Sequence, residues 1–216
     1  MVHTPAQDRH QSIDGLRGVA ILGIFAVNIF AMAYPWLAMS NPSLFPDAFN
    51  DQGRAVWTAM VGVFQFKFIT IFSALFGAGM VLMLGEEKNR EKLPIHRRRM
   101  FWLFLIGMAH CYLLWFGDIL VPYAIVGFFV AAARQWRAST LYSVGAVLIV
   151  LNFGLFWLQD FSFQFVPPED LAEITSEMWA PPPDKLQEMV DAYRSGILDR
   201  LPYTAQQSMF AQLSQV

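Results

Sequence analysis

The sequence is dominated by apolar segments that are almost free of charged residues. Five such segments lie near residues 18–36, 64–84, 100–116, 119–133 and 138–158. Each is close to the roughly 20 residues with which a helix crosses about 30 Å of hydrocarbon. Only 15% of all residues are charged, whereas a soluble domain typically carries about 25%. The sequence therefore predicts an all-α fold, a polytopic transmembrane bundle of about five helices over residues 1–158, with the lipid bilayer as a partner.

The third and fourth segments meet at Gly117 and Asp118. One long helix through both segments is an alternative. Gly117, Asp118 and Pro122 favour a turn, however, and an aspartate in mid-membrane is costly. We therefore expect an antiparallel hairpin.

Lys and Arg residues are distributed unevenly between the segments. With the N-terminus inside, the inner segments hold ten of them and the outer segments four. Cytoplasmic loops are enriched in Lys and Arg, so we expect a multipass protein of the bacterial inner (plasma) membrane with a cytoplasmic N-terminus. The inner residues are Arg9, Arg17, Lys88, Arg90, Lys92, Arg97, Arg98, Arg99, Arg134 and Arg137.

The first segment also has the outline of a cleavable signal peptide ending near Ala33. Asp8 and Asp14 precede it, and the apolar run continues to Trp36 as a membrane-interface end would. These features favour a retained span.

Residues 159–216 have a different character. Two proline clusters divide this region, and Gly196 is a helix stop signal. Apolar residues recur at helical spacing, which predicts an outer loop with one or two short amphipathic helices; a loosely ordered loop is the alternative. The recurring residues are Leu186, Met189, Val190 and Tyr193.

Several classes of function find no support in the composition. The net charge of −2 gives no basic face for a nucleic acid. Cys111 is the single cysteine, which excludes an intrachain disulfide and a thiolate metal cluster. Nucleotide-binding, zinc-ligand and Gly-x-Ser-x-Gly motifs are absent from the sequence. We therefore expect neither a metal site nor a bound cofactor.

His110 is a candidate for catalysis because it lies about ten residues into the third apolar segment. Histidine exchanges a proton near neutral pH, although a purely structural hydrogen bond between helices is the alternative. Asp118 follows eight residues later, which is about 12 Å along a continuous helix. We therefore expect Asp118 to orient a turn or to pair with Lys67 rather than to hold His110.

Three further polar residues lie toward the outer side. Lys67 lies some four residues into the second segment, where it faces a polar cavity or extends its amine to the interface. Asn28 and Gln65 are supporting candidates, because amides in apolar helices usually bond a neighbouring helix. Lys67, Asn28, Asp118 and Gln65 are therefore the polar candidates of the outer side.

Charged residues on the inner side form two groups. Asp14 and Arg17 are three residues apart and can pair across one helical turn. Arg97, Arg98 and Arg99 follow His96 in a run that attracts phosphate, whether from lipid head groups or from a ligand. A cytoplasmic anion-binding site is predicted to contain Asp14, Arg17, Arg97, Arg98 and Arg99.

Three motifs stand in order along the chain. The first is SIDGLRGVAILGI at residues 12–24, followed by Val27-Asn28-Ile29. The second is Phe66-Lys67-Phe68, followed by FSALFG at residues 72–77. The third runs from Arg97 through His110 to Leu120. Together they resemble the YeiB-like family of bacterial polytopic membrane proteins.

That family is of unknown function, and it is similar to transmembrane acyltransferases. The resemblance implies transfer of an acyl group from cytoplasmic acyl-CoA to an acceptor on the outer side. His110 would be the general base, and Arg17 with Arg97 to Arg99 would face the phosphates of CoA. The acceptor side would be lined by the polar residues Lys67, Asn28, Asp118 and Gln65. The resemblance further implies several helices beyond residue 216, so that the chain would be a fragment or a truncated gene product.

Two alternatives remain beside the acyltransferase. A transporter or exporter is suggested by Lys67 and Asp118 as pathway charges, although the sequence shows no internal repeat and no Gly- or Pro-broken helix of the kind that transporters use. In a non-catalytic membrane protein, the polar residues would only lock helices together.

Overall fold

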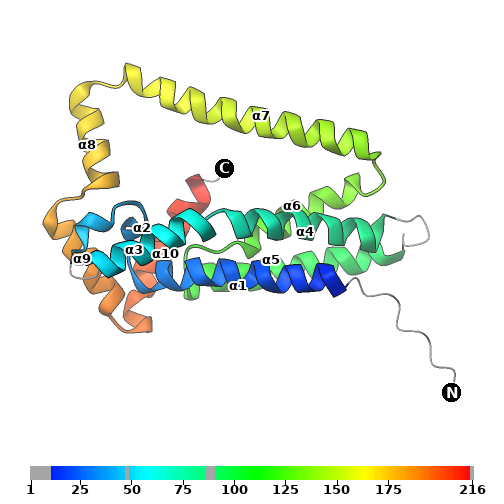
Figure 1. Cartoon of the computed structure of the whole chain (residues 1–216), viewed down its shortest axis with the longest axis horizontal. Coiled ribbons are helices and arrows are strands. Elements are labelled where there is room, and N and C mark those ends of the chain that lie inside the picture. The colour runs from blue at the N-terminus through cyan, green and yellow to red at the C-terminus, as the bar shows by residue number, and fades with distance from the viewer. Residues whose placement is uncertain (1–10, 47–48, 86–90, 215–216) are drawn as a thin grey trace. The chain divides into compact units, whose positions relative to one another are not determined.

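The computed structural model describes residues 11–46, 49–85 and 91–214 (Figure 1). Every regular element in these ranges is helical, which confirms the all-α prediction for the described part of the chain. The chain divides into two compact units, Met1–Met80 and Val81–Val216.

The first unit contains two long apolar helices, α1 (Gln11–Ala33) and α4 (Lys67–Leu84), the second of which continues past the boundary of the unit. Gly23 of α1 lies directly against α4, because a Cβ at this position would overlap the ring of Phe68. The shorter elements between the two long helices are α2 (Leu37–Ser40), η1 (Pro42–Leu44), α3 (Asp51–Ala59) and η2 (Met60–Phe64).

The second predicted segment is interrupted. A π-helical turn, η2, follows α3 directly, and Phe66 then adopts a φ of +65° before α4 begins at Lys67. A positive φ is uncommon for a residue with a side chain and ends a right-handed helix. Lys67 is therefore the first residue of α4 rather than the fourth residue of a helix that begins near Phe64.

The second unit begins with two antiparallel helices. They are α5 (Leu93–Leu113) and α6 (Leu120–Val130), the latter extended by the turn η4 (Ala131–Ala133). The chain therefore reverses around Gly117 and Asp118, and one continuous helix through both segments is excluded. Helix α5 starts earlier than predicted, because Pro94 opens its first turn and the run from His96 to Arg99 is itself helical.

The remaining elements of the second unit are helical as well. Proline residues open the first turns of α8 and α9, where their missing N–H costs nothing, and Gly196 separates α9 from α10. The tail is thus helical, and the alternative of a loosely ordered loop is wrong. These elements are α7 (Ala138–Ser162), η5 (Phe163–Phe165), α8 (Pro168–Trp179), α9 (Pro183–Arg194) and α10 (Ile197–Ser214).

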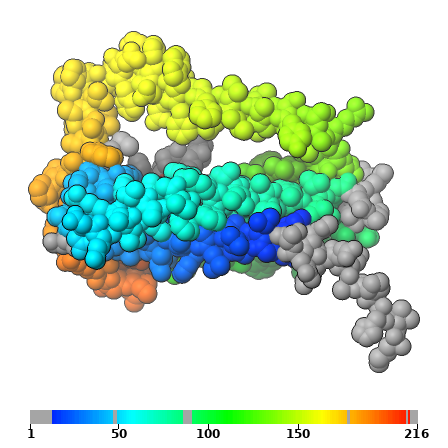
Figure 2. Space-filling model, viewed as in Figure 1, coloured from blue at the N-terminus to red at the C-terminus, as the bar shows by residue number. Residues whose placement is uncertain are grey.

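Three helical segments are long and apolar enough to cross a membrane: Ile13–Ala33, Asp51–Leu84 and Ala138–Phe165. A shorter apolar helix covers Leu120–Ala133. Helix α7, yellow-green to yellow in Figures 1 and 2, has no buried residue along its length. A helix that is apolar and exposed all round is suited to lipid rather than water, so the chain is a membrane protein.

Candidate functional site

The candidate site lies at the closed end of the α5–α6 hairpin. Gly107 makes the close approach of the two helices possible: a Cβ there would lie 2.8 Å from the backbone nitrogen of Val121 and 2.9 Å from the Cβ of Leu120. Any larger residue would therefore push the start of α6 away from α5. This contact sets the distance over which side chains of the two helices meet.

The turn between the helices is held by one carbonyl in the last turn of α5. The backbone N–H groups of Leu114 and Trp115 both donate to the carbonyl of His110, at 2.9 and 3.0 Å. Gly117 follows beneath the Trp115 ring, which would overlap a Cβ at that position. The chain thereby reverses within a few residues and returns Asp118 to the level of His110.

His110 and Asp118 form a hydrogen-bonded dyad. The Nδ1–H of His110 donates to Oδ1 of Asp118 at 2.8 Å. Oδ2 of the same carboxylate accepts the backbone N–H of Val121, also at 2.8 Å, which caps the start of α6. The Asp118 side chain is 1% exposed and that of His110 is 28% exposed. The carboxylate is thus fixed while the imidazole keeps an accessible edge.

This dyad corrects the expectation drawn from spacing. Eight residues along a continuous helix would hold the two side chains about 12 Å apart, but α5 ends at Leu113 and the chain folds back. Asp118 therefore both orients a turn and holds His110. Its two oxygens bond His110 and the backbone of Val121, and the pairing with Lys67, which belongs to the other unit, stays a prediction.

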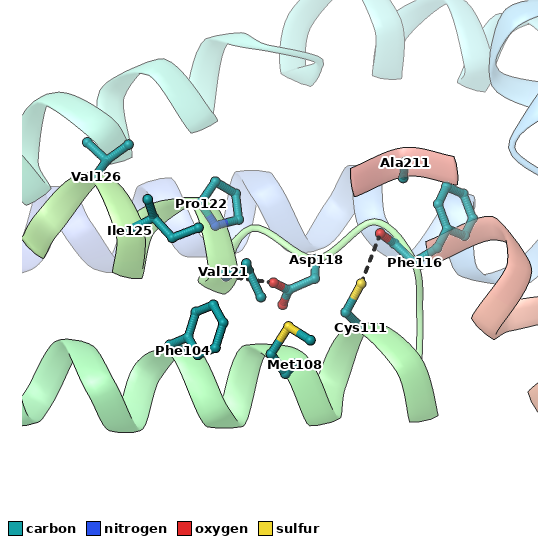
Figure 3. A pocket seen from close by; sticks show the side chains of 10 residues that line it. All are labelled: Phe104, Met108, Cys111, Phe116, Asp118, Val121, Pro122, Ile125, Val126 and Ala211. Carbon is teal, nitrogen blue, oxygen red and sulfur yellow. Dashed lines mark hydrogen bonds between the residues drawn. The ribbon is translucent and has the colours of Figure 1, made fainter. Parts of the chain in front are cut away.

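A cavity of about 480 Å³ lies against Asp118, the carboxylate partner of His110 (Figure 3). Phe104, Met108 and Cys111 line it from α5, and Asp118, Val121 and Ile125 line it from the turn and α6. Its size is within the range of small-molecule sites, roughly 300–1,000 Å³. Apart from the Asp118 carboxylate and the Cys111 thiol, the side chains on its walls are apolar.

Helix α10 closes one wall of this cavity through Ala211. It is attached to α5 by Ser208, a fully buried residue whose hydroxyl lies 2.7 Å from the carbonyl oxygens of both Cys111 and Thr204. The sequence offered no signal for this contact, because a serine 97 residues away from Cys111 has no local pattern linking the two.

His96 is a second residue that sequence reasoning did not single out as a site. Its side chain is buried, and Nε2–H donates to the carbonyl of Gly127 at 3.0 Å. It therefore ties the opposite end of the hairpin together. The arginines that follow are exposed: Arg97 lies over the ring of Phe128, 5.7 Å from its centroid, and Arg99 donates to the sulfur of Met83 at 3.5 Å.

The predicted inner residues of the first unit are close together. Arg17 pairs with Asp14 at 3.3 Å, which confirms the expected ion pair across one turn. Its guanidinium also donates to the carbonyl of Leu75 at 3.2 Å and lies against Gly79, where a Cβ would overlap it. Arg17 is therefore anchored to α4.

The predicted outer residues of this unit do not form one cluster of hydrogen bonds. Lys67 donates to the carbonyl of Val61 at 3.3 Å, next to the break between η2 and α4. Gln65 ends the π-helical turn, with its backbone N–H on the carbonyl of Met60. Asn28 is half-buried on α1.

Comparison with known proteins gives three relatives. The uncharacterized protein YxaH of Bacillus subtilis is 36% identical over 157 residues, which cover 70% of this chain and 39% of YxaH. The uncharacterized protein YeiB of Escherichia coli is 33% identical over 160 residues, which cover 70% of this chain and 38% of YeiB. This chain is homologous to YxaH and YeiB. The predicted resemblance to the YeiB-like proteins is thereby confirmed.

A third relative, an uncharacterized 39.9 kDa protein of Bacillus acidopullulyticus, is 29% identical over 66% of this chain. The matches span about two fifths of the length of these relatives. No protein-family model and no solved structure matches the chain.

Proposed function

We propose that this chain carries the general base of a bacterial inner-membrane acyltransferase. The enzyme would transfer an acyl group from cytoplasmic acyl-CoA to an acceptor on the outer side of the membrane. The observation that carries the proposal is the hydrogen bond of 2.8 Å between His110 Nδ1 and Asp118 Oδ1. A buried carboxylate on one imidazole nitrogen is the arrangement that orients a catalytic histidine.

The dyad defines which nitrogen acts as the base. Because Nδ1 carries the proton that Asp118 accepts, Nε2 keeps its lone pair. In the proposed step, Nε2 takes the proton of an acceptor hydroxyl while the acceptor oxygen attacks the thioester carbonyl. A carbon–oxygen bond forms and the carbon–sulfur bond breaks. His110 then returns the proton to the departing CoA thiolate.

Two features favour the imidazolium that forms in this step. The Asp118 carboxylate lies at hydrogen-bonding distance. His110 also lies in the last turn of α5, at the negative end of the helix dipole. Both lower the cost of the positive charge that appears on His110 when it accepts a proton.

The proposed topology places the substrates on opposite sides. It has five spans, and the ten inner Lys and Arg residues support a cytoplasmic N-terminus. Of these ten, Arg9, Lys88 and Arg90 lie outside the described residues. In this arrangement, Arg17, positioned by Asp14, and Arg97 to Arg99 would attract the phosphates of acyl-CoA. Lys67, Asn28 and Gln65 would lie toward the acceptor side.

The test is transfer of radiolabel from acetyl-CoA in inverted membrane vesicles. His110→Ala should lower the rate of label transfer by about 10²–10⁴-fold, the usual contribution of a positioned base. Gln206→Ala, an exposed change on α10, is the control and should retain activity. Equal transfer by His110→Ala and the parent protein would overturn the proposal and leave a non-catalytic role.

A transporter is the second candidate, because the structure contains a helix break that the sequence did not predict. Between η2 and α4 the chain passes through Phe66 at positive φ, and Lys67 bonds a carbonyl of the π-helical turn. Transporters use broken helices at their ion and substrate sites. Substrate flux into proteoliposomes without any acyl donor, abolished by Lys67→Ala, would favour this function over acyl transfer.

A further inference from the structure

A second cavity of about 320 Å³ adjoins the one at Asp118 along the hairpin. Phe104 of α5 and Ile125 of α6 line both cavities. The second cavity extends to Phe101 and Phe128, and Arg97 lies at its far end. The two cavities are therefore neighbours along the hairpin. Together they are here called the α5–α6 groove, with Asp118 of the dyad among the residues of the first cavity and Arg97 among those of the second.

The two walls of the groove have the same spacing. On α5 the wall residues include Phe101, Phe104, Met108 and Cys111, and on the turn and α6 they include Asp118, Val121, Ile125 and Phe128. Steps of three and four residues keep each set on one helix face. The ten helical steps from residue 101 to residue 111 cover about 15 Å along the axis. The groove therefore extends over about this length of the hairpin.

The chemistry of the groove selects its occupant. Between the dyad and Arg97 the lining side chains are apolar, apart from the Cys111 thiol. A sugar, a peptide or the amide-containing arm of CoA would leave its polar groups without partners there, at a cost of roughly 1–3 kcal/mol each. An alkyl chain has no such groups and gains from burial.

The rim of the groove shows how such a chain could enter. Ile125 is 45% exposed and Phe129 is 68% exposed, so large apolar side chains border the groove on its open side. Exposed apolar side chains of a membrane protein are suited to contact with hydrocarbon, which would allow lateral entry from the bilayer. A lipid of the outer leaflet would have its polar head at the dyad end and its chain along the groove.

We propose that the acceptor of the acyl group is a membrane lipid, whose alkyl chain lies in the α5–α6 groove and whose hydroxyl or amine lies at the His110–Asp118 dyad. This rests on the proposed acyl transfer and names its acceptor class. The groove selects the acceptor by its chain, and the dyad removes the proton from its head group.

The experiment separates labelled products by organic extraction after incubating vesicles with radiolabelled acetyl-CoA. Label in the lipid fraction is expected. Ile125→Trp should reduce this label by about tenfold or more by filling the groove. Ile149→Trp, a matched change on the exposed face of α7, should leave it unchanged. His110-dependent label on water-soluble or protein acceptors would overturn the lipid assignment and leave the acyltransferase standing.

A second measurement does not depend on turnover. In the His110→Ala protein, a lipid with a photoreactive alkyl chain should crosslink to residues around Phe104 and Ile125. Ile125→Ala, which enlarges the groove without overpacking, should retain this labelling, whereas Ile125→Trp should lose it. Labelling spread evenly over the exposed helices would overturn the groove as a specific site. Specific labelling combined with no acyl transfer by the parent protein would contradict the proposed reaction, and with it the role of the lipid as acceptor.

Discussion

Gly107 of α5 lies against the backbone of Val121 at the start of α6, with space for no side chain between them. The N–H of Val121 is also the group that holds Oδ2 of Asp118. One contact between helices therefore sets both the spacing of the hairpin and the position of the carboxylate that orients His110.

Gly107→Ala should separate the two helices and destabilise the fold. A methyl group 2.8 Å from a backbone nitrogen must displace the helix, and overpacking of this kind costs about 1–3 kcal/mol. Thermal unfolding in detergent measures the loss. The same variant should also lose acyl transfer, because Asp118 moves with Val121.

Gly145→Ala is the matched control. Gly145 lies in α7 with open space around it, so the substitution should change stability only through helix propensity, by up to about 1 kcal/mol in the favourable direction. If Gly107→Ala also proved neutral or stabilising, the close approach of α5 and α6 would be contradicted.

Asp118 has two roles that substitution can separate. Asn can still accept the Val121 N–H, since Asn and Asp cap helices about equally well, so Asp118→Asn should unfold close to the temperature of the parent protein. It lacks the charge that orients and stabilises His110, and transfer should fall by about 10²–10⁴-fold. Asp118→Ala should lose the cap as well, at about 1 kcal/mol. A loss of activity only in Asp118→Ala would indicate a capping role alone.

The sequence predicted the individual residues of the candidate site better than their arrangement. His110 and Asp118 were identified because ionisable groups in apolar segments are costly. Their pairing could not be predicted from helical spacing, because it depends on where α5 ends. That end is set by the turn at residues 114–119 and by the packing of Gly107, which are properties of two helices together.

Helices occur at all five positions where apolar segments predicted them, because segment length and composition suffice for that step. Helix boundaries were predicted less well. The run from His96 to Arg99 is part of α5, since charged residues form helices readily. The break at Phe66 involves neither Gly nor Pro, so no local signal could reveal it.

The attachment of α10 to α5 should depend on Ser208. Its hydroxyl is fully buried and lies 2.7 Å from the Cys111 carbonyl, and a hydrogen bond of this kind contributes about 1 kcal/mol. Ser208→Ala should therefore increase the rate at which a protease cleaves α10. Ser195→Ala, a change at an exposed serine in the same region, is the control and should leave cleavage unchanged. Equal cleavage rates in the parent protein and in both variants would contradict the contact.

The contact between α9 and α10 should weaken at alkaline pH. Burial raises the pKa of Tyr193 above its ordinary value, with Tyr203 nearby adding to the shift and Arg200 opposing it. Burial also raises the pKa of Tyr203.

In the unfolded chain both phenols titrate near pH 10. Below about pH 10, burial of the two phenols therefore contributes fully to the free energy of unfolding. As the pH rises above that value the stability falls, because the unfolded state then binds fewer protons than the folded state. Thermal unfolding across this range should show the decline, and Tyr193→Phe should make it less steep. A Tyr193→Phe protein with the same alkaline decline as its parent would contradict the burial of this phenol.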